Sequence, residues 1–241
     1  MGWIARLEAA IAKGRFVIFV QELRSLGGEP SQCELFVRLM TEDGTLIPPQ
    51  SFVPAAERDG LMLAIDRWVI TAALQYMATS PESDQERGSI NLCCASVCEP
   101  SLAKFLAEQL ARFGVGADRL CFEITEAALN ASQAQAPELL GRLRTMGAHV
   151  TLDDFGMGVA SFTAIKNLNV DLLKIDAHLI TKVLTDSVDA AVVRSICQIA
   201  NLTGISVGAK GVADDATLER LPTLGVDFFQ GFAIGAPSPL R

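Results

Sequence analysis

The chain has 241 residues and a net charge of −8; half of its residues are hydrophobic and a fifth are charged. This apolar content excludes a disordered chain, and the acidic balance argues against a general nucleic-acid binder, which would carry a basic surface. The length suits one large domain, and single barrels often have this size. No signal-peptide pattern opens the chain, and no apolar run approaches the roughly 20 residues that cross a bilayer. We therefore expect a soluble chain, or a soluble part of a longer protein.

The predicted elements alternate between strands and helices along most of the chain. Short apolar runs predict strands over residues 15–26, 33–41, 89–94, 120–125, 149–154, 170–176, 205–210 and 226–231. Apolar residues at helical spacing predict helices over residues 1–14, 48–78, 99–114, 137–147, 161–168, 188–204 and 214–225. Strands that alternate with long helices imply a mainly parallel sheet, and this number of units favours a barrel over an open sheet. The first two strands, joined by a short turn, could open the barrel as an antiparallel pair.

Polar residues interrupt or end these apolar strands. They are Glu34, Asn91, Glu123, Asp153, Asp154, Lys174 and Gln230. In a parallel barrel the carboxyl-terminal strand ends meet on one face, where active sites are built, so we expect these side chains to lie together. Each alone has a structural explanation, such as a helix cap for an Asp pair or a lysine that reaches the rim. Jointly they favour a metal site.

Four carboxylates in one dry pocket need positive charge to offset their repulsion and desolvation. Their hard oxygen ligands suit Mg²⁺ or Mn²⁺. The adjacent Asp153 and Asp154 could place one carboxylate between two metals, and such a pair clamps a phosphorus centre during displacement. Lys174 could orient or deprotonate an attacking water, or neutralise a phosphate oxygen.

A series of motifs resembles that of the EAL-domain family. The motifs are "ELFVRL", "SINL", "FEITE", "LDDFGMG", "LLKID" and "FFQGFAIGAP", in this order. The resemblance runs from about Arg15 to the C-terminus, which implies an EAL domain over residues 15–241 after a linker helix over 1–14. It also implies a TIM-like (β/α)8 barrel with one antiparallel opening strand. Active members of this bacterial family use Mg²⁺ or Mn²⁺ to hydrolyse cyclic di-GMP to pGpG, and others act as its receptors.

The resemblance implies a role for each matching residue. The first metal would be held by Glu34, Asn91, Glu123 and Asp153, and the second metal would face Asp153 and Asp154. Lys174 would assist the attacking water and Gln230 would position it. Glu126 would anchor the loop after "DDFG", and Gln21 and Arg38 would contact a base or phosphate of the ligand.

The chain departs from the family pattern at three places. "AKGVA" at residues 209–213 stands where the family usually has Ala-Glu-Gly-Val-Glu, so Lys210 replaces a glutamate needed at the second metal. The loop "DFGMGVAS" lacks the usual Thr and Tyr-Ser, and Glu22 stands in place of a proline. An ammonium at position 210 would repel a metal and could pair with Asp154 in its place. A like-charge contact at about 4 Å would cost several kcal/mol at intermediate dielectric.

Three functions remain open from the sequence. We favour a domain that binds cyclic di-GMP with weak or lost hydrolysis and a first metal site more readily filled than the second. The alternative is an active cyclic di-GMP phosphodiesterase, and the third is a protein-interaction scaffold without ligand, which the many retained acids disfavour. The resemblance further implies a cytoplasmic domain of bacterial signalling with cyclic di-GMP as partner and a homodimer as candidate assembly. DNA is not expected as a partner, and a membrane only through another domain of a longer protein.

Overall fold

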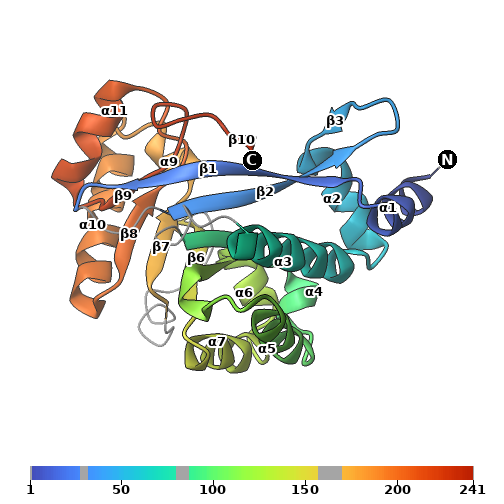
Figure 1. The fold of residues 1–241 in the computed structure, drawn as a ribbon. Helices are drawn as coiled ribbons and strands as arrows, with labels where there is room; N and C mark the ends of the chain where they lie inside the picture. The colour runs from blue at the N-terminus through green and yellow to red at the C-terminus, as the bar shows by residue number, and fades with distance from the viewer. Residues whose placement is uncertain (1, 28–31, 80–86, 157–169, 241) are drawn as a thin grey trace.

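A computed structural model describes residues 2–27, 32–79, 87–156 and 170–240 of the chain. Within these ranges, eight strands close into a barrel in the order β1, β2, β4, β5, β6, β7, β8, β9 and back to β1 (Figure 1). Their bounds are β1 Phe16–Ser25, β2 Gln32–Met40, β4 Arg87–Asn91, β5 Leu120–Thr125, β6 His149–Phe155, β7 Leu172–Ile175, β8 Ser206–Ala209 and β9 Phe228–Phe229.

Strand β1 is the one reversed strand among the eight described strands of the barrel. It pairs antiparallel with β2 and with β9, whereas every other neighbouring pair in the barrel is parallel. The predicted TIM-like (β/α)8 barrel with an antiparallel opening strand is therefore confirmed. All but one residue of β5 are buried, which explains why this strand reads as an unbroken apolar run around a single glutamate.

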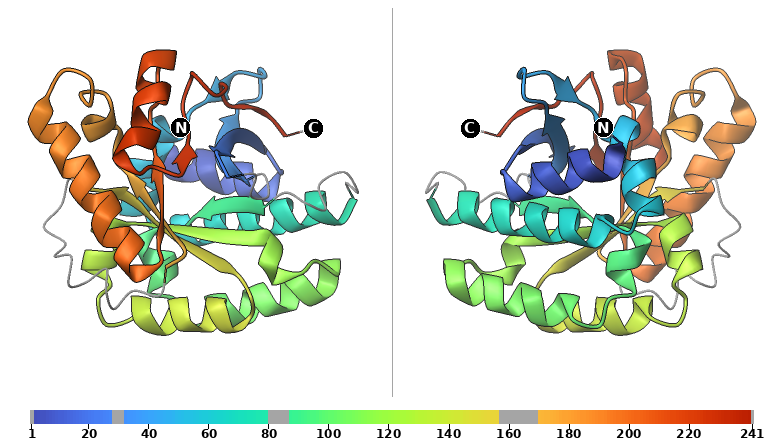
Figure 2. Two further views of the ribbon diagram at one scale, coloured as in Figure 1. Left: turned by 90° about the vertical axis from the view of Figure 1, so that its left-hand side faces the viewer. Right: turned by 90° about the vertical axis from the view of Figure 1, so that its right-hand side faces the viewer.

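Helices surround the barrel, as the two views of Figure 2 show. In the part of the chain that the structure describes they are α1 Trp3–Ala12, α2 Pro49–Arg58, α3 Met62–Thr79, α4 Cys94–Val97, α5 Leu102–Phe113, α6 Glu126–Ala131, α7 Ala136–Thr145, α9 Ala177–Ile180, α10 Ser187–Thr203 and α11 Asp215–Arg220. The same described ranges contain two 3₁₀ turns, Ala117–Arg119 and Leu221–Leu224. None of the helices in the described ranges is long and apolar enough to cross a membrane.

The expected helix over 48–78 is two helices, because Gly60 takes a left-handed φ of +70° between α2 and α3 and ends the first helix. The short elements α4, α6, α9 and the two-residue strands β3 (Leu46–Ile47) and β10 (Ser238–Pro239) were not expected. The helix expected over 161–168 and most of the altered loop over 154–161 lie outside the described residues.

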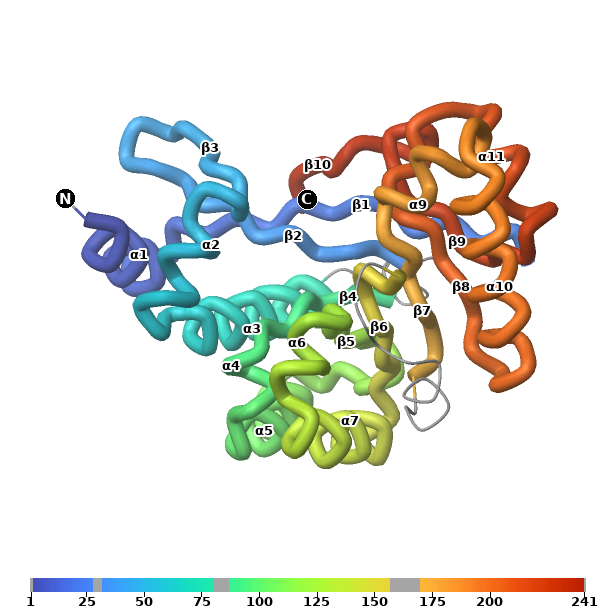
Figure 3. The backbone as a smooth tube through the Cα atoms, turned by 180° about the vertical axis from the view of Figure 1, so that it is seen from behind, coloured from blue at the N-terminus to red at the C-terminus, as the bar shows by residue number. Residues whose placement is uncertain are grey.

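Only the first four residues of β2 pair with β4, and the rest of β2 continues beyond the barrel with β1 beside it. Figure 3 shows this two-stranded ribbon running on towards α1 and α2. The ribbon and α2 therefore project beyond the carboxyl-terminal ends of the parallel strands, and both line one side of the candidate site.

Candidate functional site

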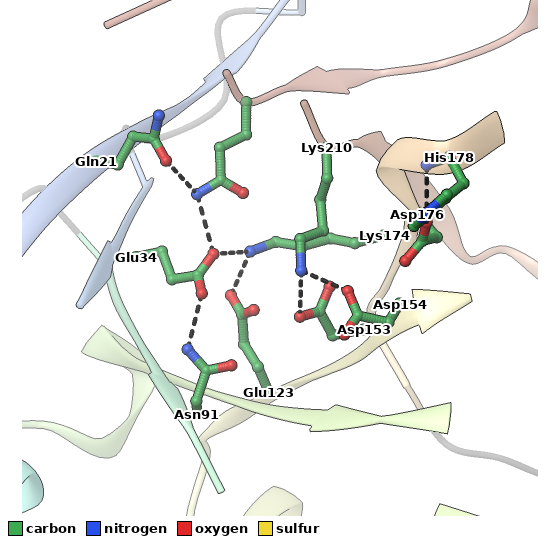
Figure 4. Close-up of polar contacts among 11 residues, drawn as sticks. Gln21, Glu34, Asn91, Glu123, Asp153, Asp154, Lys174, Asp176, His178 and Lys210 are labelled. Atoms are coloured by element: carbon green, nitrogen blue, oxygen red, sulfur yellow. Dashed lines mark hydrogen bonds and ion pairs between the residues drawn. The ribbon is translucent and has the colours of Figure 1, made fainter. Parts of the chain in front are cut away.

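Lys174 lies at the centre of the site, on β7. Its ammonium Nζ donates to Glu34 Oε2 at 2.8 Å and to Glu123 Oε1 at 2.5 Å, and all three side chains are buried (Figure 4). Glu34 comes from β2, which lies across the barrel from β7, and Glu123 comes from β5, which is separated from β7 only by β6. A buried lysine between two buried carboxylates explains how the apolar strands tolerate three charged residues.

Two amides complete the surroundings of Glu34. Asn91 at the end of β4 donates from Nδ2 to Glu34 Oε1 at 2.7 Å, and Gln230 just after β9 donates from Nε2 to Glu34 Oε2 at 2.9 Å. The Gln230 amide also reaches Gln21 Oε1 on β1 at 3.4 Å, and Gln21 Nε2 donates to the carbonyl of Gly235 at 2.8 Å. The amides therefore fix both oxygens of Glu34 and tie β1 to the site.

Lys210 forms the second ionic cluster with Asp153 and Asp154. Its Nζ lies 2.7 Å from Asp153 Oδ2 and 2.6 Å from Asp154 Oδ1. Adjacent residues of a regular strand point to opposite faces, so two consecutive aspartates would not normally share a partner. Here Asp154 takes a left-handed φ of +52° and the β6–β7 register shifts between Leu152 and Phe155. This bulge turns both carboxylates towards Lys210.

Burial and mutual charge set the protonation of the buried groups. Burial raises the pKa of Glu123 to about 8, and the negative charge of Glu34 adds to the effect. Burial acts in the same direction on Glu34, but attraction by Lys174 and Lys210 outweighs it and lowers the pKa of Glu34 to about 2. Burial would also lower the pKa of Lys174 and of Lys210, yet the surrounding carboxylates outweigh it and raise both pKa values. Both lysines are therefore ammonium ions at neutral pH.

The first predicted metal site suits a hard divalent cation. Glu34, Glu123 and Asp153 each offer an oxygen within 4.8 Å of the others. Two oxygens there, Glu123 Oε2 and Asp153 Oδ1, are buried without a hydrogen-bond partner in the described part of the chain. A buried carboxylate oxygen without a donor is costly, and a cation would satisfy it. The three carboxylates are the donor set that Mg²⁺ or Mn²⁺ prefers.

The second predicted metal site does not suit a cation. One oxygen of Asp153 and one of Asp154, the two residues expected at the second metal, already accept hydrogen bonds from Lys210. A protonated lysine has no lone pair to offer a metal and repels it. As long as Lys210 keeps this position, its ammonium opposes a second cation beside Asp153 and Asp154.

A groove of about 570 Å³ opens beside both clusters. Its walls include Glu34, Asn91, Asp153, Asp154 and Lys210 from the barrel rim, and Phe36 and Val37 from the ribbon. Helices α2 and α3 contribute apolar and polar residues, among them Gln50, Val53, Glu57 and Asp66. The groove is thus charged at the barrel rim and mostly apolar along its helical wall.

Sequence reasoning missed the helical wall of the groove. Asp66 is buried in α3 and accepts a hydrogen bond from the backbone N–H of Cys93 at 3.0 Å, so it fixes the chain directly after β4. A lone aspartate within the apolar run "LMLAIDRWVI" was the available signal. Asp66 therefore holds in place the segment that follows Asn91.

Two other predicted residues lie outside the ionic clusters. Glu126 begins α6 and accepts a hydrogen bond at Oε2 from the backbone N–H of Gly156 at 3.1 Å, directly before the loop that it was expected to anchor. Arg38 lies farther along β2, with its guanidinium 5.3 Å from the ring centre of Phe19 and 5.8 Å from that of Phe36. Arg38 does not join the clusters, and its role towards a ligand stays a prediction.

A family model described as EAL domain matches residues 4–237. The chain belongs to the EAL domain family. Among curated relatives, this EAL domain is 36% identical over 236 residues to "Cyclic di-GMP phosphodiesterase PdeF" of Escherichia coli (strain K12). The match covers 98% of the chain but 32% of that protein, so the chain spans about a third of the length of this curated relative.

Solved structures of EAL domains have the same fold. The structure titled "PaMucR Phosphodiesterase, c-di-GMP complex" superposes with a TM-score of 0.92 at 28% identity, covering 99% of this chain and 98% of that one. The FimX EAL domain from Pseudomonas aeruginosa bound to c-di-GMP gives a TM-score of 0.93 at 27% identity, covering 99% and 97%. Both of those proteins hold the cyclic dinucleotide in their structures.

Proposed function

We propose that this EAL domain binds cyclic di-GMP and hydrolyses it weakly or not at all. The observation that carries the proposal is the position of the Lys210 ammonium, 2.7 Å from Asp153 and 2.6 Å from Asp154, where a second metal would need those oxygens. Ligand binding is supported by the family, by the groove beside the ionic clusters and by the two similar structures that contain this ligand.

The residues of the first site have distinct parts in this proposal. Glu34, Asn91, Glu123 and Asp153 would hold one Mg²⁺ or Mn²⁺, which when bound polarises a phosphoryl oxygen and lowers the pKa of a water. Lys174 keeps Glu34 and Glu123 in place, and its ammonium adds a buried positive charge beneath the groove. Gln230 orients Glu34 and, through Gln21, the rim of β1.

The competing function is an active cyclic di-GMP phosphodiesterase, and the complete first site favours it. The two buried oxygens of Glu123 and Asp153 without partners in the described residues are those a metal would satisfy. A single metal with Lys174 would then suffice for turnover. The two functions predict different rates of pGpG formation by the native chain when metal and cyclic di-GMP are supplied.

The deciding experiment compares the native chain with Lys210→Glu and with Lys182→Glu, which alters an exposed lysine outside the groove. Each protein is incubated with cyclic di-GMP and Mg²⁺ or Mn²⁺, and pGpG is followed by chromatography. We expect the native chain and Lys182→Glu to be nearly silent and Lys210→Glu to gain at least about tenfold, since one restored charge interaction of about 1.4 kcal/mol gives that factor. Formation of pGpG by the native chain at about 1 per second or faster, an ordinary enzyme rate, would instead establish the phosphodiesterase.

A further inference from the structure

We propose that Lys210 binds a phosphodiester oxygen of the ligand itself and so takes the place of the second cation in ligand binding. The inference rests on the proposed binding of cyclic di-GMP, and it assigns to Lys210 a positive role beyond the exclusion of a metal. It follows from where the ammonium is held, from its remaining donor and from the charge of the site.

The Lys210 ammonium is held firmly at the groove. Its backbone N–H donates to the carbonyl of Ile175 at 3.2 Å, which fixes the residue at the end of β8. The two aspartates then hold the far end of the side chain, and Figure 4 shows Lys210 reaching down to both carboxylates. Because the Lys210 side chain is held both at its backbone and at its ammonium, it loses little further conformational freedom when a ligand binds.

One donor of the ammonium is left for a ligand. A lysine ammonium has three N–H donors, and the bonds to Asp153 and Asp154 use two of them among the described residues. The Lys210 side chain is 24% exposed and forms part of the groove wall. By contrast, the Lys174 side chain is 1% exposed, so it has no comparable access to a ligand in the groove.

The charge of the site leads to the same conclusion. Once metal binding has removed the proton of Glu123, all four carboxylates are ionised and both lysines are protonated. The net formal charge of these side chains is then −2, which one divalent cation at the first site neutralises. A glutamate at position 210 would make the charge −4 and require two divalent cations. Lys210 therefore supplies the charge of one divalent cation in a site that must accept the anionic phosphates of the ligand.

The test is calorimetric titration of cyclic di-GMP in EDTA, which removes divalent cations. Lys210→Met removes the donor and the charge, whereas Lys210→Met combined with Asp154→Asn removes the donor but restores the net charge. Lys182→Met is the matched control, and thermal unfolding checks that each variant is folded. We expect the native chain and Lys182→Met to bind alike, and both Lys210 variants to bind about 10- to 100-fold more weakly, as the loss of a charged hydrogen bond implies.

Each other outcome overturns the inference in a recognisable way. Affinity restored in the double variant would show that Lys210 acts only by neutralising carboxylates. Equal affinity of the native chain and Lys210→Met would show that Lys210 does not contact the ligand. Binding by the native chain with Mg²⁺ but not in EDTA would overturn the inference and leave the proposed function standing. Absence of binding under both conditions would overturn both.

A second readout counts cations directly. Mn²⁺ bound in the presence of cyclic di-GMP is measured by electron paramagnetic resonance. We expect one Mn²⁺ per native chain and two per Lys210→Glu chain. Two Mn²⁺ per native chain would overturn the inference, because the second cation would then occupy the position assigned to the ammonium.

Discussion

At the scale of single residues, the protonation of Glu123 governs whether the first site accepts a metal. Its carboxyl lies 2.5 Å from the Lys174 ammonium, but burial and the charge of Glu34 still raise its pKa to about 8. A metal needs the ionised carboxylate, so binding must release this proton. Below the pKa of such a group, each fall of one pH unit lowers its ionised fraction about tenfold.

We therefore predict that the affinity of the native chain for Mn²⁺ rises with pH and levels off above about pH 8. Below that value the apparent dissociation constant should change by up to about tenfold per pH unit. Paramagnetic resonance titrations between about pH 6 and 8.5 measure it, and Glu123→Gln, which has no proton to release, should bind weakly with a flatter profile. A native affinity that is constant over this range would contradict the assigned protonation of Glu123.

Residue identity could be predicted from the sequence better than residue conformation. The motifs pointed to Glu34, Asn91, Glu123, Lys174 and Gln230, and the structure brings all five together. Motifs are short and local, whereas the left-handed turn at Asp154 depends on the paired strand β7 and on the lysine that both aspartates share. Such a conformation is set by tertiary contacts, and no local pattern predicts it.

At the scale of elements, the close contact between the segment after β8 and the segment after β9 depends on one glycine. Gly231 follows Gln230 with φ +156°, and a Cβ there would lie 2.2 Å from the carbonyl oxygen of Val212. Val212 in turn bonds its N–H to the carbonyl of Gln230 and its carbonyl to the N–H of Ala233. The segment that carries Gln230 and the segment after Lys210 are therefore packed backbone to backbone.

We predict that Gly231→Ala destabilises the chain by roughly 2–3 kcal/mol, because the added methyl group must push one backbone segment away from the other. Urea unfolding measures this loss. The control is Gly141→Ala: Gly141 is exposed in α7 with open space around its Cβ, so alanine there should add about 0.5–1 kcal/mol. Equal stability of the native chain and Gly231→Ala would show that these two backbone segments can move apart at little cost in free energy.

Element boundaries followed from the sequence where a local signal existed. The strand expected over 120–125 has these bounds as β5. An apolar run interrupted only by Glu123 follows a polar turn, and the strand ends at Thr125, which is also the N-cap of α6. The expected helix over 48–78 was wrong in its continuity, although Asp59-Gly60 within it was a visible break. The strands β3 and β10 have two residues each and carry no periodicity that could be read.

At the scale of the whole molecule, β1 closes the barrel by pairing with β2 on one side and β9 on the other. The β1–β2 pair could be predicted because a short turn joins the two strands, but the β1–β9 pair joins residues 24–25 to 228–229 and has no local signal. It follows only from closure, since a sheet of this many parallel units curls until its edges meet. The number of strand-helix units already favoured a closed barrel, and the family resemblance implied the same closure.

The division into a linker helix over 1–14 and a domain over 15–241 stays a prediction. In the structure Leu7 and Ala10 of α1 are fully buried in the same core as Phe16, Phe52 and Ile70. Ile4 on the same helix is 47% exposed. These exposed fractions indicate that one face of α1 is part of the core of the domain.

We therefore predict that Leu7→Ala lowers the free energy of unfolding of the whole molecule by about 2–5 kcal/mol, the usual cost of such a cavity, while Ile4→Ala changes it by less than about 0.5 kcal/mol. Trp3 lies in α1 and Trp68 in α3, so a Trp68→Phe background makes tryptophan fluorescence report on α1 alone. In that background, fluorescence and far-ultraviolet circular dichroism should follow one urea transition, because α1 and the barrel share a core. A fluorescence transition at lower urea than the loss of helix would mean that α1 unfolds separately, and Leu7→Ala would then move only the first transition. That result would support α1 as a linker that can detach from the barrel.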